Sequence, residues 1–155
     1  QDELPVKINK TKVKQRYFRY LIFVDAEQQC VVKKRSGAGI WKGLYEFPLL
    51  ESDVPAEAPT LKELKSLLNV EGITVSNLRR YNDTPVVHLL SHRKIWADFF
   101  EIHLTPLLSD LDLDPQWEII SLQKLHSLPV PVSPCMVTLM LAFTAFCIIL
   151  KICSI

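Results

Sequence analysis

The chain has 155 residues, of which 48% are hydrophobic and 23% are charged, and its 18 Lys and Arg nearly balance its 17 Asp and Glu. This length fits one domain with flanking segments, and the balanced composition excludes a basic tail and a disordered acidic chain. The charge is unevenly spread, because residues 1–43 carry ten Lys or Arg against four Asp or Glu, whereas residues 44–155 are net negative. A positive first third suits a surface that lies on phosphates, although charge alone favours a solvated lysine-rich linker.

The first segment, 1–14 (QDELPVKINKTKVK), has little apolar periodicity, which predicts an interdomain connector that enters from an upstream domain. It has no secretion signal and no initiator methionine, so we expect a fragment of a longer cytoplasmic protein. The four cysteines form no C-x-x-C and no closely spaced Cys/His quartet: Cys30, Cys135, Cys147 and Cys153. We therefore expect no zinc site, no iron-sulfur cluster and no disulfide framework in this chain.

From Gln15 onward, short runs rich in β-branched and aromatic residues predict strands. These runs are RYFRYLIFV (16–24), CVVKKR (30–35), LYEFPLL (44–50), ITVSNLRRY (73–81), VVHLLSH (86–92) and KIWADFFEIHL (94–104). The linker DAEQQ between the first two runs is short enough for a hairpin, which predicts that these two strands pair antiparallel.

Two helices are predicted within and after this series of strands. Thr60 is placed to cap the segment LKELKSLLN, whose four leucines share one helical face. Ser121 stands in the same position before LQKLHSL, whereas 105–116 (TPLLSDLDLDPQ) is expected to form a loop. We therefore predict a mixed α/β domain of the α+β class, in which a central, mostly antiparallel mixed sheet is flanked by two helices.

The final segment, CMVTLMLAFTAFCIIL (135–150), is uncharged, continuous and preceded by the proline-rich LPVPVSP. Its 16 residues fall short of the roughly 20 that a bilayer-spanning helix needs. Three interpretations stay open: a buried or partner-docked helix, a membrane anchor, and a tail foreign to the domain, such as out-of-frame coding. We expect the folded domain to occupy residues 15–132 and the apolar tail to occupy residues 133–155.

The segment RSGAGIWKGLYEFP (35–48) is the most specific motif in the chain. Its three glycines cluster around Ile40 and Trp41, which predicts a tight backbone path that leads into a strand. The motif closely resembles the G-I-W-x-G-L-x-E-F-P of the carboxy-terminal domain of MutY adenine DNA glycosylases. The resemblance runs from about Val13 to about Val132, through an H-x-x-S-H loop and a final W-x-x-x-x-x-L-x-x-L-P-x-P.

This resemblance implies a MutT/Nudix-like fold that is appended to a helical catalytic domain and recognises 8-oxoguanine opposite adenine in duplex DNA. The parent protein would be an A/G-specific adenine DNA glycosylase of base excision repair, an N-glycosidic bond hydrolase. Adenine removal, base flipping and any iron-sulfur cluster would belong to the upstream domain. This chain would have no catalytic centre, no cofactor and no metal, and its partners as a monomer would be that DNA and the upstream domain.

A Nudix-like fold raises the question of whether the chain is itself a hydrolase. Active Nudix enzymes hold magnesium with a helix of the form R-E-x-x-E-E-x-G, because a hard cation needs several carboxylate oxygens. Anchoring that motif on Gly72 and Ile73 aligns it with 65–70 (KSLLNV), which has no carboxylate. Shifting the register to Lys62 and Glu63 recovers one glutamate of three. The glutamates of this region are expected to be solvated surface charges: Glu46, Glu51, Glu57 and Glu63.

The run His88, Leu89, Leu90, Ser91, His92 resembles the family's H-x-F-S-H loop, whose serine contacts the lesion. Oxidation of guanine at C8 places a hydrogen on N7 and a carbonyl beside it, and a serine hydroxyl can accept from the first and donate to the second. On the resemblance, His92 would contact phosphate or base, and Leu90 offers an apolar wedge without the stacking face of phenylalanine. The alternative is that Ser91 and His92 merely end a strand.

Basic residues near these motifs are candidates for phosphate contacts and equally ordinary surface charges: Lys33, Lys34, Arg35, Lys42 and Arg93, with Arg79, Arg80 and Lys94 beside them. Aromatic residues of the strands are expected in the core, not as base-stacking platforms: Trp41, Trp96, Trp117, Phe99 and Phe100. His103 and His126 have no partner at ligand or triad spacing, and Ser91 lacks the orienting acid of a nucleophile.

Two other functions stay open. One is an active Nudix-type hydrolase of oxidised nucleoside triphosphates, which magnesium-dependent release of phosphate from 8-oxo-dGTP would favour. The other is a degenerate Nudix module for protein contact, which a Ser91→Ala change without effect on lesion discrimination would favour.

Overall fold

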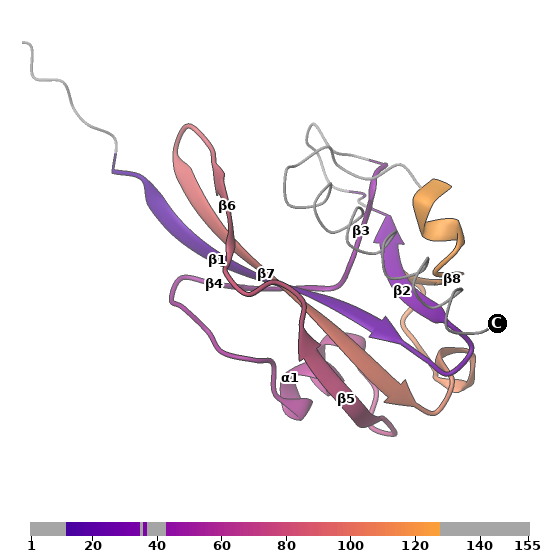
Figure 1. Ribbon diagram of the computed structural model, residues 1–155. Helices are drawn as coiled ribbons and strands as arrows, with labels where there is room; N and C mark the ends of the chain where they lie inside the picture. The colour runs from indigo at the N-terminus through magenta and orange to yellow at the C-terminus, as the bar shows by residue number, and fades with distance from the viewer. Residues whose placement is uncertain (1–11, 35, 37–42, 128–155) are drawn as a thin grey trace, which may run out of the picture.

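The computed structural model describes residues 12–34, 36 and 43–127. Two long strands, β1 (Lys14–Val24) and β7 (Arg93–Thr105), form the centre of its sheet (Figure 1). They run parallel and in register along the whole of β1. The second half of each strand is covered on both faces, which explains the nearly continuous apolar run LIFV in β1.

On one side of this pair, the strands that adjoin β1 split into two groups. β4 (Leu49–Ser52) pairs with β1 at residues 17–20, whereas β2 (Gln29–Lys34) meets β1 only at the pair of Val24 and Cys30. Beyond that pair β2 diverges from β1. It continues into a separate arm with β3 (Tyr45–Glu46) and β8 (Trp117–Ser121).

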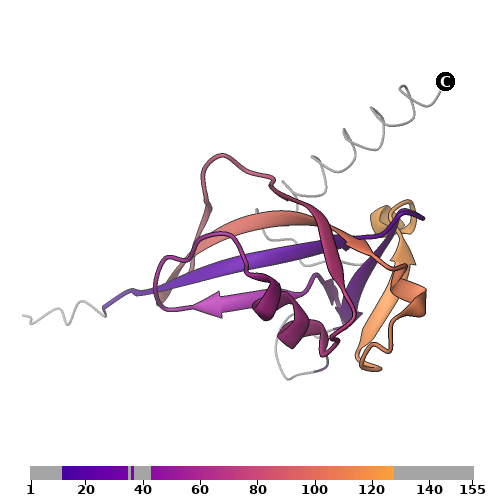
Figure 2. The same ribbon diagram turned by 90° about the horizontal axis from the view of Figure 1, so that it is seen from below.

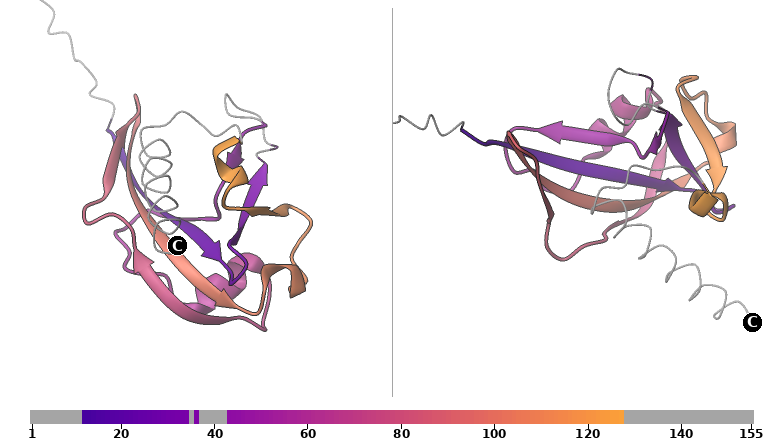
Figure 3. Two further views of the ribbon diagram at one scale, coloured as in Figure 1. Left: turned by 45° about the vertical axis from the view of Figure 1, so that its right-hand side comes forward. Right: turned by 90° about the horizontal axis from the view of Figure 1, so that it is seen from above.

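On the other side, β5 (Thr74–Arg80) and β6 (Val86–Leu89) share the outer edge of β7. β6 pairs with the first part of β7 and forms a hairpin with it, and β5 pairs with the last part. The result is one curled mixed sheet, as the composition of the strands predicted. The β6–β7 hairpin and the β8 arm lie at opposite ends of the molecule (Figure 3).

The turn between β1 and β2 is the predicted antiparallel hairpin, and Asp25 organises it. The Asp25 side chain is buried, and its Oδ1 accepts hydrogen bonds from the backbone N–H groups of Glu27 and Gln29, both at 3.0 Å. Its Oδ2 accepts from the N–H of Leu108, also at 3.0 Å, so the same carboxylate holds the distant loop after β7. Gln28 completes the turn in the left-handed region at φ 58°.

Helix α1 (Leu61–Leu68) begins at the predicted cap. The Thr60 hydroxyl accepts from the backbone N–H of Glu63, and the Glu63 carboxylate accepts from the backbone N–H of Thr60, which completes a capping box. Leu64 and Leu68 are buried against the sheet. The helix ends at a left-handed residue, which favours asparagine there.

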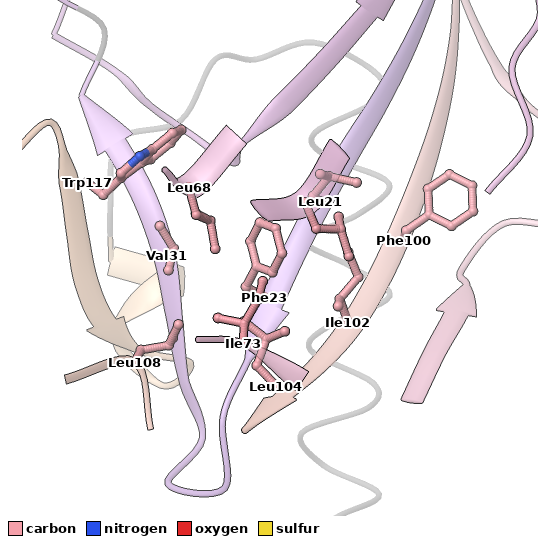
Figure 4. Close-up of a cluster of buried hydrophobic side chains, with 11 residues drawn as sticks. Leu21, Phe23, Val31, Leu68, Ile73, Phe100, Ile102, Leu104, Leu108 and Trp117 are labelled. Atoms are coloured by element: carbon pink, nitrogen blue, oxygen red, sulfur yellow. The ribbon is translucent and has the colours of Figure 1, made fainter. Parts of the chain in front are cut away.

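Two apolar clusters cover the two faces of β1 and β7. The cluster on the α1 side contains Leu21, Phe23, Val31, Leu64, Leu68, Ile73, Phe100, Ile102, Leu104, Leu108 and Trp117 (Figure 4). The cluster on the other face contains Ile22, Val24, Cys30, Val32, Phe47, Ala97, Phe99, Leu122 and Leu125. Both clusters lie mainly at the end of the sheet away from the tip of the β6–β7 hairpin, although Ala97 of β7 belongs to the second cluster and Val86 of β6 packs against it.

The prediction of a second helix after Ser121 was wrong for the residues that the structure describes. The Ser121 hydroxyl does accept from the backbone N–H of Lys124 at 3.3 Å, but it leads only into a 3₁₀ turn, η2 (Lys124–Ser127). Pro129 and Pro131 come soon afterwards in the sequence, and a proline disfavours the helical conformation of the residue before it. The loop expected at 105–116 contains a second 3₁₀ turn, η1 (Leu108–Asp110).

Two further expectations need correction or lie beyond the described residues. The run 44–50 forms two strands instead of one, because Pro48 has no N–H to donate and the chain leaves β3 there before β4 begins. Strand β8 was not among the predicted strand runs, which ended at residue 104. The glycine motif at 37–42 and the apolar tail lie outside the described residues, among which no helix is long and apolar enough to cross a bilayer.

Candidate functional site

A tight turn at residues 90–93 closes the β6–β7 hairpin, at the position where the sequence placed the H-x-x-S-H loop. Leu89 pairs with Lys94, and the backbone N–H of Leu90 donates to the carbonyl of Arg93 at 2.8 Å. Ser91 and His92 form the two-residue tip between these pairs. Both are exposed, and neither side chain makes a hydrogen bond to another described residue. Their hydroxyl and imidazole groups are therefore available to a ligand.

Lys14, the first residue of β1, makes a backbone hydrogen bond to this turn. The backbone N–H of Lys14 donates to the carbonyl of His92 at 3.0 Å, and Lys14 lies beside Arg93 in the parallel register. The start of β1 and the hairpin consequently project together from the same end of the sheet (Figure 1). The expected connector 1–14 thus supplies the residue that braces the turn.

Uncompensated positive charge gathers on one face of this hairpin. Lys14 and Arg93 are exposed, and within the described residues neither forms an ion pair. Arg16 comes next on the same face but binds Glu51, at 3.1 Å, and Asp53, which neutralise it. Lys14 and Arg93, the cations nearest the 90–93 turn, can therefore bind an anionic partner.

The other predicted contact residues of the loop lie close to this face. His88 is half-buried on β6 opposite Ile95, so it shares the face of Lys14 and Arg93. Leu90 is 39% exposed, which leaves an apolar side chain free beside Ser91. The structure therefore brings together His88, Leu90, Ser91, His92 and Arg93.

The remaining predicted phosphate contacts are not brought to the hairpin. Lys33 and Lys34 lie on β2, where Lys33 pairs with Glu46 at 3.7 Å and lies 5.3 Å from the centre of the Trp117 ring. Lys34 lies over Tyr45 in the same arm. Arg35 and Lys42 lie outside the described residues. Arg79 and Arg80 are engaged with Glu101 and Asp98.

Trp96 is not the core residue that the sequence suggested. Its indole Nε1 donates to Gln15 Oε1 at 2.7 Å, its ring lies parallel to Tyr17 with centres 6.4 Å apart, and Lys94 Nζ lies 4.3 Å from the ring centre. It is half-buried on the hairpin face opposite Arg93. Trp117, Phe99 and Phe100 are core residues as predicted.

The carboxylates do not converge on a metal site within the described part of the chain. No group of three His, Cys, Asp or Glu side chains there could hold an ion. Glu63, the one glutamate recovered by shifting the Nudix motif, is engaged by Arg19 at 2.8 Å and by the Thr60 backbone at 2.8 Å. These hydrogen bonds, from Arg19 first and from Thr60 second, lower the pKa of Glu63 from 4.5 to about 2. Glu63 is thus a structural partner of a buried arginine, not the free surface charge that we expected.

Acid titration is expected to reveal this role of Glu63. A carboxylate with a lowered pKa in the folded chain stabilises the fold above its unfolded pKa, and loses that contribution as the pH falls to its folded pKa. The window here runs from about pH 4.5 down to about pH 2. Since 37% of the side chain is exposed, solvent screening limits the contribution to about 1 kcal/mol.

Urea unfolding of the wild type and of Glu63→Gln measures this contribution. The wild type should be the more stable near pH 7, and the two free energies of unfolding should converge near pH 2. A difference that stays constant over the whole range would contradict the role of Glu63.

The sequence did not predict the buried carboxylate of Glu101 on β7 and its two partners. Glu101 is 3% exposed and binds Arg79 at 2.9 Å and His103 at 2.5 Å. Residues two apart on a strand share a face, so the spacing of Glu101 and His103 could have predicted that their side chains are neighbours. Glu101 lies eight positions along β7 from Arg93, about 26 Å, so this carboxylate is remote from the turn.

The fold is shared with a large family of known proteins. Residues 19–135 match the family described as NUDIX domain. The C-terminal domain of mouse MUTYH, solved in complex with human PCNA, is 16% identical over 81% of this chain and 86% of that chain, with a TM-score of 0.59. The E. coli ORF135 protein is 19% identical over 86% and 91%, with a TM-score of 0.58. The MutT protein from Methanosarcina mazei Go1 is 17% identical over 86% and 94%, with a TM-score of 0.54. Identities this low establish a shared fold and leave the function open.

Proposed function

This chain belongs to the NUDIX domain family, and we propose that it uses this fold to recognise 8-oxoguanine opposite adenine in duplex DNA. The observation that carries the proposal is the exposed Ser91–His92 tip, braced by Lys14 and flanked by cations without carboxylate partners among the described residues. The fold it shares with the C-terminal domain of mouse MUTYH is consistent with this role. The parent protein in this proposal is an adenine DNA glycosylase of base excision repair.

The chemistry of the tip suits the lesion. At the edge of 8-oxoguanine, N7 carries a hydrogen and C8 carries a carbonyl, which inverts the acceptor that guanine offers at N7. The Ser91 hydroxyl accepts from N7–H and donates to O8, a pair of roles that lysine and arginine cannot fill because they have no acceptor. Lys14 and Arg93 hold the phosphates on either side, and Leu90 contacts a neighbouring base through its apolar side chain.

The proposal assigns no bond-breaking step to this chain. Of the Nudix helix motif, α1 offers Glu63 alone, and this carboxylate is committed to Arg19 and to the helix cap. Hydrolysis of the adenine glycosidic bond, base flipping and any iron-sulfur cluster fall to an upstream catalytic domain. The recognition domain adds differential affinity for the lesion strand, which favours adenine opposite 8-oxoguanine over adenine opposite thymine.

Fluorescence anisotropy of the chain with labelled duplexes tests the proposal. The duplexes have one sequence and differ only in the base opposite adenine, which is 8-oxoguanine or thymine. We expect about tenfold tighter binding to the 8-oxoguanine duplex, the effect of one or two added hydrogen bonds.

The same preparation is incubated with 8-oxo-dGTP and magnesium as a control for the hydrolase alternative. We expect no release of phosphate or diphosphate. Equal affinity for the two duplexes, or metal-dependent hydrolysis of the nucleotide, would contradict the proposal.

A further inference from the structure

A groove of about 580 Å³ lies on the face of the sheet opposite the proposed DNA contacts. Its floor is formed by Tyr17 of β1 and by Trp96 and Phe100 of β7, and its walls include Pro55 and Ala58. Pro55 and Ala58 belong to the loop between β4 and α1, which passes in front of β1 and β7 in the view from below (Figure 2). Aromatic rings and prolines thus surround an open, mostly apolar space.

The two arginines that line this groove are paired within the chain, whereas the exposed carboxylate of Glu57 makes no ion pair with another described residue. Arg19 binds Glu63 at 2.8 Å and the carbonyl of Glu57 at 3.3 Å. Arg80 binds Asp98 at 2.5 Å, and Asn82 donates to the same carboxylate at 3.2 Å. With both arginines paired, the groove offers its occupant mainly apolar and aromatic contact, which suits a large apolar side chain.

The apolar lining continues out of the groove onto the hairpin. Val87 pairs with Trp96 and Leu89 pairs with Lys94, so all four side chains share the groove face. Val87 is 40% exposed, Leu89 is 70% exposed, and Val54 at the loop is 65% exposed. Exposed apolar side chains beside an apolar groove mark contact sites for other macromolecules.

One cation lies beside the groove, next to its Trp96 floor. Lys94 lies over the Trp96 ring at 4.3 Å, and its ammonium makes no ion pair within the described residues. We propose that this groove, which is separate from the proposed DNA contacts, docks a protein segment. The segment inserts one large apolar side chain into the groove and sets an acidic residue against Lys94. A protein segment suits the exposed aliphatic side chains of Val87 and Leu89 as well as the single cation, whereas a nucleic acid strand would stack on the rings but needs more cations for its phosphates.

Nuclear magnetic resonance titration with defined peptides tests this docking site. The probes are blocked pentapeptides Asp-Glu-X-Glu-Asp, in which X is phenylalanine, tryptophan, leucine, proline or alanine. We expect saturable shifts of the Trp96 indole resonance with at least one large apolar X, at a dissociation constant of about 1 mM or tighter, and at least tenfold weaker binding for alanine.

Two variants and a matched control locate the binding. Ala58→Phe fills the groove from a loop position and should weaken the best peptide at least tenfold, whereas Ser66→Phe on the exposed face of α1 should leave it unchanged. Lys94→Glu should shift the preference toward the corresponding Lys-Lys-X-Lys-Lys peptide. Circular dichroism checks that each variant is folded.

Three results would overturn the proposal. The first is the absence of saturable shifts with every large apolar peptide. The second is unchanged peptide affinity in Ala58→Phe. The third is tighter binding of a short oligothymidylate than of any peptide at the Trp96 resonance, which would assign the groove to single-stranded DNA.

Discussion

Replacing Ser91 by alanine is expected to remove most of the preference for the 8-oxoguanine duplex, about tenfold in relative affinity, while binding to undamaged duplex stays unchanged. The Ser91 hydroxyl can hydrogen-bond to both groups that oxidation creates, the N7–H donor and the O8 acceptor. Alanine offers neither an acceptor for N7–H nor a donor for O8. Ser91 is exposed at the hairpin tip, so the substitution creates no cavity and should leave the stability of the fold intact.

Anisotropy with the paired duplexes measures this effect, and two variants serve as controls. Ser91→Thr keeps a hydroxyl and should retain part of the preference. Ser109→Ala removes an exposed serine hydroxyl in η1, remote from the hairpin, and should retain all of it. A Ser91→Ala chain that discriminates as well as the wild type would show that the loop serves another purpose, such as protein contact.

Replacing Asp25 by alanine is expected to lower the free energy of unfolding by about 3 kcal/mol. The carboxylate accepts three backbone hydrogen bonds at 3.0 Å, and one of their donors, the N–H of Leu108, is buried. Removing the carboxylate leaves that N–H without an acceptor and releases the η1 loop from the β1–β2 turn. The variant also avoids the desolvation cost of the buried Asp25 carboxylate, and this offsets part of the lost free energy of unfolding.

Urea unfolding near pH 7 gives the magnitude of this effect. Asp83→Ala is the matched control, because Asp83 is exposed and its carboxylate makes no hydrogen bond to a described residue; we expect a change within about 0.5 kcal/mol for it. A loss below about 1 kcal/mol for Asp25→Ala would mean that water or the backbone replaces the carboxylate.

Local features of the fold could be predicted from the sequence because they depend on residues close in the chain. Branched and aromatic runs located most of the strands, and Thr60 marked the start of α1, although the part that Glu63 plays in the capping box was not predicted. The five-residue linker around Asp25 implied the antiparallel hairpin of β1 and β2. The strand pattern included Ser91 and His92 in the run 86–92, and only the resemblance to the H-x-F-S-H loop placed them between two strands; β6 in fact ends at Leu89.

Two local predictions, at β8 and after Ser121, failed for reasons that lie in the neighbouring sequence. The branched residues of β8 were passed over because the preceding proline- and aspartate-rich stretch suggested a loop. Ser121 caps as expected, but the prolines beyond it limit the helical segment to a 3₁₀ turn within the described residues.

The sequence by itself determined the local elements and the chemical types at the hairpin tip, since hydrogen bonding and hydrophobic periodicity over a few residues decide those. Only the tertiary structure decided that Lys14 braces His92 across the parallel β1–β7 pair, that Lys33 and Lys34 lie in another arm, and that Trp96 forms the floor of a groove. Pairing between strands almost eighty residues apart depends on how whole faces pack, and no short-range pattern encodes that partner choice.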